Sequence, residues 1–398
     1  MDALITVEVT DADGTQRDLP LERLWLLVVI DCASRAVLGY HISLASNYTA
    51  DDVLDCIAHT LKPWSSSSEV TARIGYKPGA GIPSGLSVNS TWRCFDSLAL
   101  DNAMAHTSAW VQERIIRTVG CEINTGRPAR ALSRAIVERF FRTFEDESLH
   151  RWPSTTGSSP KDPRRNKAEK AAERLKVTLD DLENIADVTI ANYNATPHKS
   201  LNGRTPLDYI RYFDEQALTM PRHLTANDRN TLPLYDREFC RRIAGDHRRG
   251  RRPYIVFMGA HYRSEALATL VDHIGDTVTL IVNVMDIRTV HAFLGDGTSI
   301  GSLTANDPWL RQPHSLRTRR AILKLIKAGE LSRETHNPVG DHLKYLAGRA
   351  RLTRRDRNKM LNAAREIGNR NDSISSQPPP TQRITRRRRI SISNVSTG

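Results

Sequence analysis

The first 150 residues carry the pattern that most restricts the fold, because strand-like and helix-like segments alternate along them. Residues 24–30 (LWLLVVI) and 36–44 (AVLGYHISL) are apolar runs of a length typical of buried strands. Residues 2–9 alternate apolar and polar side chains in part, as a strand does. We expect these three segments to form an antiparallel meander.

Helices and short strands are expected after the meander. Thr49 has the side chain of a helix cap, and apolar residues at positions 53, 57 and 61 would share one helical face. The remaining expected elements are a strand at 98–100, a helix at 108–119, a strand at 121–124 and a helix at 133–147. This order predicts an α/β architecture in which helices cover both faces of a mixed sheet.

A different pattern begins near residue 232. Short β-rich runs are flanked by turns at Gly275-Asp276 and Asp296-Gly297, which predicts a small barrel or sandwich. Beyond Pro308 the chain is basic and helical in character, and its last residues, with PPP and RRRR, have the composition of a disordered segment. We therefore expect an α/β core at 1–215, a β-barrel at 216–304, and a basic helical segment with a disordered tail at 305–398.

Positive charge is concentrated in two regions. From Lys344 to the end, 14 lysines and arginines face three acids, which accounts for +11 of the formal net charge of +12. A second cluster, RRIAGDHRRGRR, holds six arginines: Arg241, Arg242, Arg248, Arg249, Arg251 and Arg252. Such clusters either keep a surface solvated or neutralise phosphates, so these six arginines are the candidate DNA-binding residues.

Other features exclude several classes of protein. The five cysteines are scattered, odd in number and without CxxC spacing, which argues against a disulfide framework or a zinc ribbon and fits a reduced cytoplasm. The longest apolar run, 24–30, is far too short to cross a bilayer, and the N-terminus lacks a secretory pattern. We expect a cytoplasmic protein with no membrane partner.

Three acids stand where the predicted core would bring them together: Asp2, Asp101 and Glu138. Asp2 lies on the first expected strand, Asp101 ends the segment LALD, and Glu138 lies on the helix AIVERFFRTF. Carboxylates are the ligands that Mg²⁺ prefers, and two such ions can drive an in-line displacement at phosphorus. Taken alone, an Asp that ends a strand is more often a cap or turn former than a metal ligand.

The amino-acid sequence around these acids resembles the catalytic core of the retroviral-integrase superfamily, most of all the Mu transposase and TnsB-like group. The segments VVIDCASRAVLGYHIS, LALDNAMAHTS, GRPARALSRAIVERFFRTFE and NYNATPHKSLNGRTPLDYI occur in that order. The last segment matches the family at Tyr193, Asn194, Pro197, His198, Leu201, Gly203, Arg204, Thr205 and Pro206. The β-rich region 232–303 is similar to the barrel that follows the core in Mu-type transposases.

The resemblance assigns roles to individual residues. In the family the second Asp stands in "DN" and the Glu in "VER", which carry over to Asp101 and Glu138. Asp2 is the candidate for the first Asp, and Asp31 is the alternative; Asp31 matches a family residue that is usually not a ligand, and we expect it to bond Ser34 or Arg35. The resemblance further implies an RNase H-like fold and Mg²⁺ as cofactor, with Mn²⁺ as a substitute.

The implied activity is metal-dependent cleavage and joining of DNA in transposition, near the bacterial nucleoid. Expected partners are transposon-end and target DNA, further copies of the chain on DNA, and a target-selecting ATPase contacted by the tail. The family's helix-turn-helix domains would precede Asp2, so we expect a chain shortened at its N-terminus. Two alternatives stay open: a remnant that only binds DNA or proteins, and a plain RNase H-like nuclease.

Overall fold

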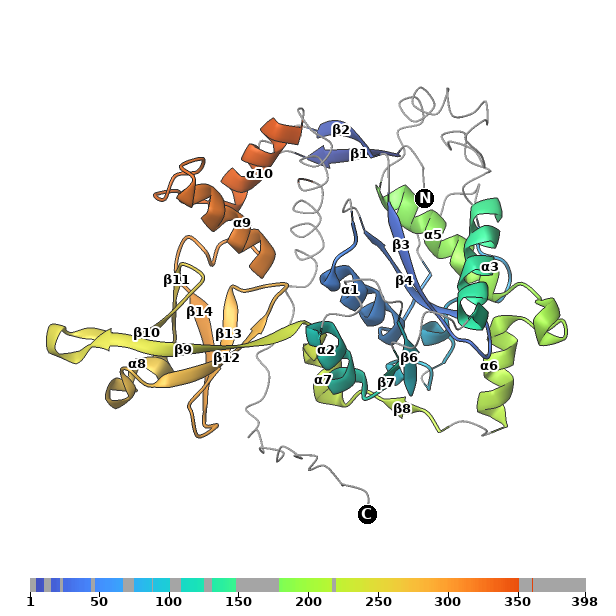
Figure 1. Ribbon diagram of the computed structural model, residues 1–398, viewed down its shortest axis with the longest axis horizontal. Helices are drawn as coiled ribbons and strands as arrows, with labels where there is room; N and C mark the ends of the chain where they lie inside the picture. The colour runs from blue at the N-terminus through green and yellow to red at the C-terminus, as the bar shows by residue number, and fades with distance from the viewer. Residues whose placement is uncertain are drawn as a thin grey trace, which may run out of the picture. The chain divides into compact units, whose positions relative to one another are not determined.

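The computed structural model describes residues 5–10, 16–21, 24–43, 47–66, 75–87, 89–100, 109–124, 131–147, 179–216, 220–350 and 360. The chain divides into two compact units, which are described separately. Unit 1 comprises Met1–Tyr235 with His342–Arg365, and unit 2 comprises Asp236–Asp341 with Glu366–Gly398. Figure 1 labels the helices and strands of both units.

The first four strands of unit 1 form two separate antiparallel pairs. β1 (Ile5–Thr10) pairs with β2 (Gln16–Leu21), and β3 (Trp25–Ile30) pairs with β4 (Val37–Ser43). Among the described residues, β1 has no ladder with β3, so the expected meander of three strands is not formed. The sequence analysis did not anticipate β2, whose letters QRDLPL include a proline and two charges.

The β3–β4 pair has helices on both faces (Figure 1). Even-numbered residues of β3 pack into one core cluster with α3 (Ala131–Glu147) and α5 (Leu179–Asn194). Leu27 and Val29 pack into the other cluster, with α1 (Ala50–Leu61) and α2 (Ala109–Val119). The period of two along β3 therefore sends alternate side chains into two cores.

The helix expected after Thr49 is confirmed. The backbone N–H of Thr49 donates to the Asp52 carboxylate at 2.6 Å, and the Thr49 hydroxyl donates to the same oxygen at 2.7 Å. Burial alone would raise the pKa of Asp52, but hydrogen bonds from His41 and Thr49 lower it to about 2. Val53, Ile57 and Leu61 are buried on one face, as the apolar spacing predicts.

The rest of unit 1 consists of short elements. β6 (Ser97–Ala99) and β7 (Glu122–Asn124) form a parallel pair, close to the two strands expected at 98–100 and 121–124. β5 (Arg93–Cys94) pairs antiparallel with β8 (Arg222–His223). The remaining helices and single turns are η1 (Pro83–Gly85), η4 (Lys199–Leu201), α6 (Pro206–Glu215), α7 (Ala226–Thr231) and η5 (Pro233–Tyr235).

Unit 2 is built on a closed six-stranded barrel in the order β10-β11-β14-β13-β12-β9. Its strands are β9 (Asp236–Asp246), β10 (Arg251–Phe257), β11 (Ala260–Arg263), β12 (Thr277–Asn283), β13 (Thr289–Phe293) and β14 (Ser299–Ala305), joined by η6 (His247–Arg249), α8 (Glu265–Ala268) and η7 (Val271–His273). Ile255, Phe257, Val278 and Leu280 are fully buried, as inward positions of a small barrel should be. The prediction of a small β-rich body is confirmed, as a barrel rather than a sandwich.

β9 and β10 extend past the barrel wall as a two-stranded arm (Figure 1). β9 pairs with β12 from Asp236 to Arg242, and its far end pairs with β10, with Asp246 opposite Arg251. The turn at the tip passes through η6 to Gly250, whose φ of 65° is the left-handed conformation that favours glycine. We call the segment from Asp246 to Arg252 the arm tip.

Two helices follow the barrel: α9 (Leu316–Lys327) and α10 (Pro338–Ala350). They agree with the helical character expected beyond Pro308, whereas the tail 370–398 lies outside the described residues. No helix in the described ranges is both long and apolar enough to span a membrane.

Candidate functional site

Of the three acids expected to hold metal, the structure describes Glu138. It lies on α3 with an exposed side chain. Asp2 and Asp101 lie outside the described residues, so the distances within the predicted triad stay untested. The structure describes the chain only up to the residue before Asp101. There, the N–H of Leu100 continues the β6–β7 ladder by donating to the carbonyl of Asn124 at 3.2 Å.

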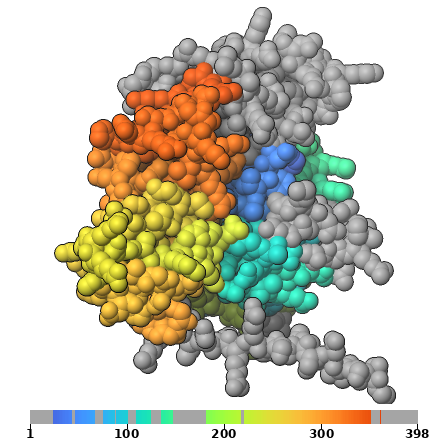
Figure 2. Space-filling model, turned by 60° about the vertical axis from the view of Figure 1, so that its left-hand side comes forward, coloured from blue at the N-terminus to red at the C-terminus, as the bar shows by residue number. Residues whose placement is uncertain are grey.

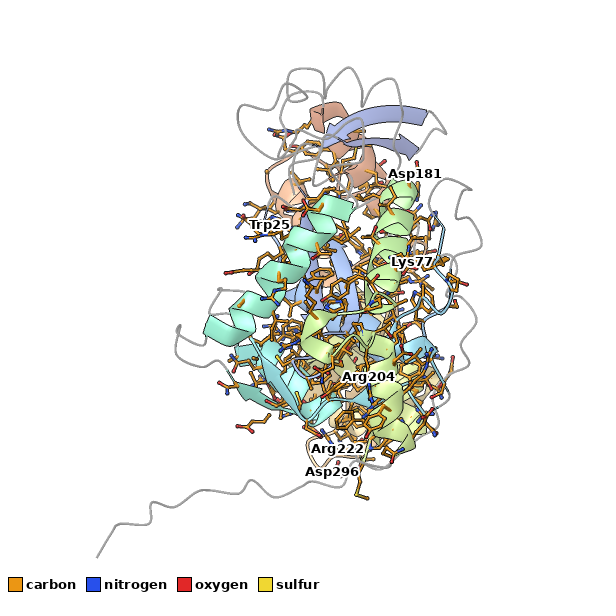
Figure 3. The ribbon with its side chains drawn as sticks, turned by 90° about the vertical axis from the view of Figure 1, so that its right-hand side faces the viewer. Trp25, Lys77, Asp181, Arg204, Arg222 and Asp296 are labelled. Atoms are coloured by element: carbon orange, nitrogen blue, oxygen red, sulfur yellow. The ribbon has the colours of Figure 1, made fainter. Side chains whose placement is uncertain are left out.

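α3 is held by aromatic side chains on the side away from Glu138. Phe140 is buried and stands two residues beyond Glu138, which places it roughly 200° around the helix. Its ring meets that of Tyr193 on α5 edge-on, with centroids 5.0 Å apart. The exposed carboxylate therefore lies on a helix whose opposite face is fixed in a core. Figure 3 shows α3 beside α5, the helix that ends in Tyr193 and Asn194.

Asn194 ties the end of α5 to the β3–β4 pair. Its side chain is fully buried; the carbonyl oxygen accepts from the N–H of Val37 at 2.8 Å, and the amide donates to the carbonyls of Val37 at 2.9 Å and Gly81 at 3.0 Å. One amide thus satisfies three backbone groups that would otherwise be unpaired in the core. It fixes Tyr193, and through it Phe140, relative to the sheet.

Asp187, two turns earlier on α5, gathers three donors. The indole of Trp64 donates to Oδ1 at 2.8 Å, the hydroxyl of Tyr40 donates to Oδ1 at 3.1 Å, and the hydroxyl of Tyr76 donates to Oδ2 at 2.6 Å. Burial, and then the neighbouring Asp187 carboxylate, raise the pKa of Tyr40 well above its usual range. This cluster joins α5 to β4 and to the connection before η1.

Asp31, the alternative first ligand, serves the turn between β3 and β4. One carboxylate oxygen accepts from the backbone N–H of Ser34 at 2.7 Å and from its hydroxyl at 2.5 Å. Arg35 then adopts a φ of 64° and donates its N–H to the carbonyl of Asp31 at 2.9 Å. The predicted structural role of Asp31 as a turn former is confirmed.

The family-like segment 193–206 also has structural contacts. The ring of His198 meets that of Tyr193 edge-on at 4.8 Å, and the Arg204 guanidinium lies 4.3 Å from the centroid of the Tyr212 ring. The Thr205 hydroxyl caps α6 by accepting from the N–H of Asp208 at 3.0 Å. Resemblance located this segment, and the structure assigns these members to packing and capping.

The six candidate arginines fall into two groups. Arg248, Arg249, Arg251 and Arg252 are all exposed and lie together at the arm tip. The single acid there is Asp246, whose carboxylate is 3.6 Å from the guanidinium of Arg249. The tip thus has a strong excess of positive charge.

Arg241 and Arg242 lie in the barrel wall instead. Arg242 is exposed, opposite Thr277 of β12. Arg241 is half-buried: its guanidinium donates to the carbonyl of Cys240 at 2.6 Å and lies 5.2 Å from the centroid of the Phe257 ring. The period of two along β9 separates these neighbours, which the sequence cluster alone treats alike.

The described ranges contain no group of three or more His, Cys, Asp or Glu side chains placed to hold a metal ion. Asp187 and Asn194 are the described residues of the site region whose contacts the sequence did not reveal. Their partners stand far away along the chain, by 157 positions for the Asn194–Val37 pair, so no local spacing could indicate them.

Comparison with known proteins gives one finding for unit 1. Residues 3–154 match the family model described as the TnsB C-terminal domain. The matched stretch contains Asp101 and Glu138 and ends before the barrel. No curated protein sequence matches the chain. This stretch is therefore similar to the C-terminal domain of TnsB-type transposases.

Proposed function

We propose that this protein is a transposase of the DDE type, which cleaves a DNA strand and joins the new 3′ end to target DNA. The observation that carries the proposal is the TnsB match over residues 3–154, a stretch that includes Asp101 in "LALDN" and Glu138 in "VER". The proposal includes an RNase H-like arrangement of the core, for which helices on both faces of β3–β4 are the supporting feature.

Asp2, Asp101 and Glu138 would hold Mg²⁺, with Mn²⁺ as a substitute. The described member fits this role: Glu138 is exposed, its carboxylate has no ion pair among the described residues, and its helix is fixed from behind by Phe140. Bound divalent ions supply Lewis-acid stabilisation of the attacking and leaving oxygens. The contribution of α3 is to hold a carboxylate in one place, because a rigid helix loses little freedom when the ligand set forms.

Replacing Glu138 with Gln tests the catalytic part. The change removes a ligand charge without adding bulk, so joining of a 3′-hydroxyl oligonucleotide in Mg²⁺ should be lost while the DNA dissociation constant stays within about threefold of wild type. The matched control is Glu145→Gln, an exposed acid on the same helix, which should join normally. Joining at the wild-type rate by Glu138→Gln would overturn the metal role.

The arm tip would bind the phosphate backbone of DNA. Arginines there are exposed and converge on one turn, which suits contacts that carry no base information. Neutralising Arg248, Arg249, Arg251 and Arg252 together should lower the slope of log K against log salt by up to about 3.6, at roughly 0.9 per phosphate contact. An unchanged slope would make the tip a solvated surface only.

A DNA-binding remnant without catalysis is the second candidate, and one observation favours it. β1, the strand that follows Asp2, pairs with β2 rather than with β3 among the described residues. A core whose first ligand is not held by the main sheet would bind DNA and fail to join it. Wild-type protein that binds DNA but gives no joined product in Mg²⁺ or Mn²⁺ would select this candidate, and cleavage without joining would select a plain nuclease.

Recruitment of a target-selecting ATPase and assembly of several copies on DNA complete the proposal. We place the ATPase contact in the tail, whose basic, proline-containing composition suits a segment that orders on a partner. Deleting residues 370–398 should spare oligonucleotide joining and abolish ATPase-directed insertion. Retention of directed insertion would remove the tail from this role.

A further inference from the structure

α9 is amphipathic in an unusual way, because its exposed side chains are all cationic along one stripe. Arg317, Arg320, Lys324 and Lys327 are exposed, at spacings of three, four and three residues, and so lie on one face of the helix. α9 contains no Asp or Glu. We call these four residues the α9 stripe.

The stripe differs from the cations of α2 and α6, each of which lies beside an acid of its own helix. On α2, Arg117 lies 2.7 Å from Glu113, and on α6, Arg211 lies 3.1 Å from Asp208. None of the four stripe residues has an ion pair within the described ranges. A solvated helix face normally mixes both signs at i,i+3 and i,i+4 spacing, so four cations in a row on a helix without an acid indicate an external anionic partner.

The opposite face of α9 is fixed to the barrel by a buried arginine. Arg319 is fully buried; its guanidinium donates to Nε2 of His314 at 2.8 and 2.6 Å and to the carbonyl of Met258 at 3.2 Å. Its guanidinium carbon lies 3.9 Å from the centroid of the Trp309 ring. Burial lowers the pKa of Arg319 to about 10, which leaves it charged at neutral pH. These contacts fix the rotation of α9 and hence the direction of the stripe.

We infer that the α9 stripe is a second binding surface for the phosphate backbone of double-stranded DNA. Its ends are ten residues apart, about 15 Å along the helix, which corresponds to roughly four phosphates at ~3.4 Å axial rise per nucleotide. Figure 2 brings forward a face on which the surface of residues 310–340 (orange) and the β9–β10 arm (yellow) are both visible. Both belong to unit 2, and both have surface on this face.

The packing of α9 favours nucleic acid over an anionic membrane. A helix that lies on a bilayer must insert its apolar face between headgroups. On α9 that face is occupied: Leu316 and Ile322 are buried, and Leu323 packs against Gly259, where an added Cβ would lie 2.9 Å from a Leu323 methyl group. The exposed side chains of α9 are all cationic, which suits a phosphate row rather than a lipid surface.

The inference rests on the proposed function, in which DNA is the substrate. The test below separates failure of the inference from failure of the proposed function. The variant R320Q/K324Q/K327Q keeps residues with good helix propensity and removes three charges. Its control, R117Q/R211Q/R311Q, removes three charges that are each paired with an acid, at 2.7, 3.1 and 3.2 Å. Circular dichroism and thermal unfolding establish that both variants fold.

Binding to a random 40-base-pair duplex is measured as a function of salt. The stripe variant should lower the slope of log K against log salt by about 2.7, equivalent to roughly 40-fold less salt sensitivity between 50 and 200 mM, and the control should leave it unchanged. An unchanged slope in the stripe variant, with wild type binding and the arm-tip variant impaired, would overturn the inference alone. Failure of wild type to bind any duplex would overturn the proposed function with it. Loss of binding to phosphatidylserine vesicles without loss of DNA binding would assign the stripe to membranes instead.

Discussion

Replacing Asp187 should reveal how strongly α5 is tied to the rest of unit 1. The carboxylate is buried and accepts three hydrogen bonds, from Trp64, Tyr40 and Tyr76. Asp187→Leu leaves those three donors facing an apolar group of similar volume. Each unsatisfied buried donor costs about 1–3 kcal/mol, and since the three donor residues are only partly buried, we take the lower half of that range. For three donors the expected loss is about 3–6 kcal/mol of unfolding free energy.

Asp187→Asn should cost less, about 1–3 kcal/mol, because an amide oxygen still accepts from two donors while the charge assistance is lost. Urea unfolding followed by tryptophan fluorescence gives both values. Asp208→Asn is the matched control: Asp208 is exposed, and its loss should cost below about 1 kcal/mol.

The reasoning depends on the donors, so it has a clear refutation. If Asp187→Leu unfolds at the same urea concentration as Asp208→Asn, the three contacts contribute nothing net, and α5 is held by apolar packing and Asn194 alone. If Asp187→Asn is as destabilised as Asp187→Leu, charge rather than hydrogen-bond count governs the cluster.

Two further predictions concern unit 2. His314 is buried, donates from Nδ1 to the carbonyl of Gln312 at 2.7 Å and accepts from Arg319 at Nε2; burial, followed by the Arg319 charge, lowers its pKa to about 4 from an ordinary 6.5. As pH falls, the unfolded chain binds a proton at His314 before the folded chain does, so the free energy of unfolding of unit 2 should fall by up to about 3 kcal/mol between pH 6.5 and pH 4. Urea unfolding measured across this pH range should show a flatter profile for His314→Gln. A profile that the substitution leaves unchanged would contradict the assignment. Gly259→Ala should cost about 1–2 kcal/mol because alanine is strained at a φ of 73°, and it should cost more because the added methyl group must displace Leu323. Gly250→Ala, at a φ of 65° with open space around it, should show the backbone cost alone. Equal losses in the two variants would show that Leu323 moves without cost.

Local signals predicted local structure well. The cap at Thr49 and the apolar period that follows it located α1 to within a residue, since both are set by neighbours in sequence. The turns at Gly275 and Gly297 could likewise be predicted from the sequence, because each needs a positive φ that glycine adopts freely. Asp31 followed the same logic, with its partner three positions away.

Features set by distant contacts could not be predicted. The sequence predicted β9 only as a charged cluster because charged residues stand on both of its faces, as the neighbours Arg241 and Arg242 show, and its strand character depends on pairing with β12 and β10. The letters RTRR do not indicate that Arg319, rather than Arg317 or Arg320, is buried. The candidate site is divided in the same way: Glu138 and the arm tip were located by motif and charge, whereas the support of α3 by Phe140 emerged from packing.

β9 runs as one continuous strand from the barrel wall to the arm tip, so it fixes the distance between the two. Because β9 passes directly from its ladder with β12 to its ladder with β10, which has one register shift between Arg251 and Tyr254, the reach of the arm is set by strand length rather than by a flexible linker. Removing two residues from each strand of the arm would draw the tip inward by about 6.8 Å and keep every side chain on its original face, whereas removing one from each would turn the arginines to the other face. The distance between a ligand bound at the barrel and a ligand bound at the arm tip is therefore set by strand length. In evolution this distance can change only in steps of whole residues.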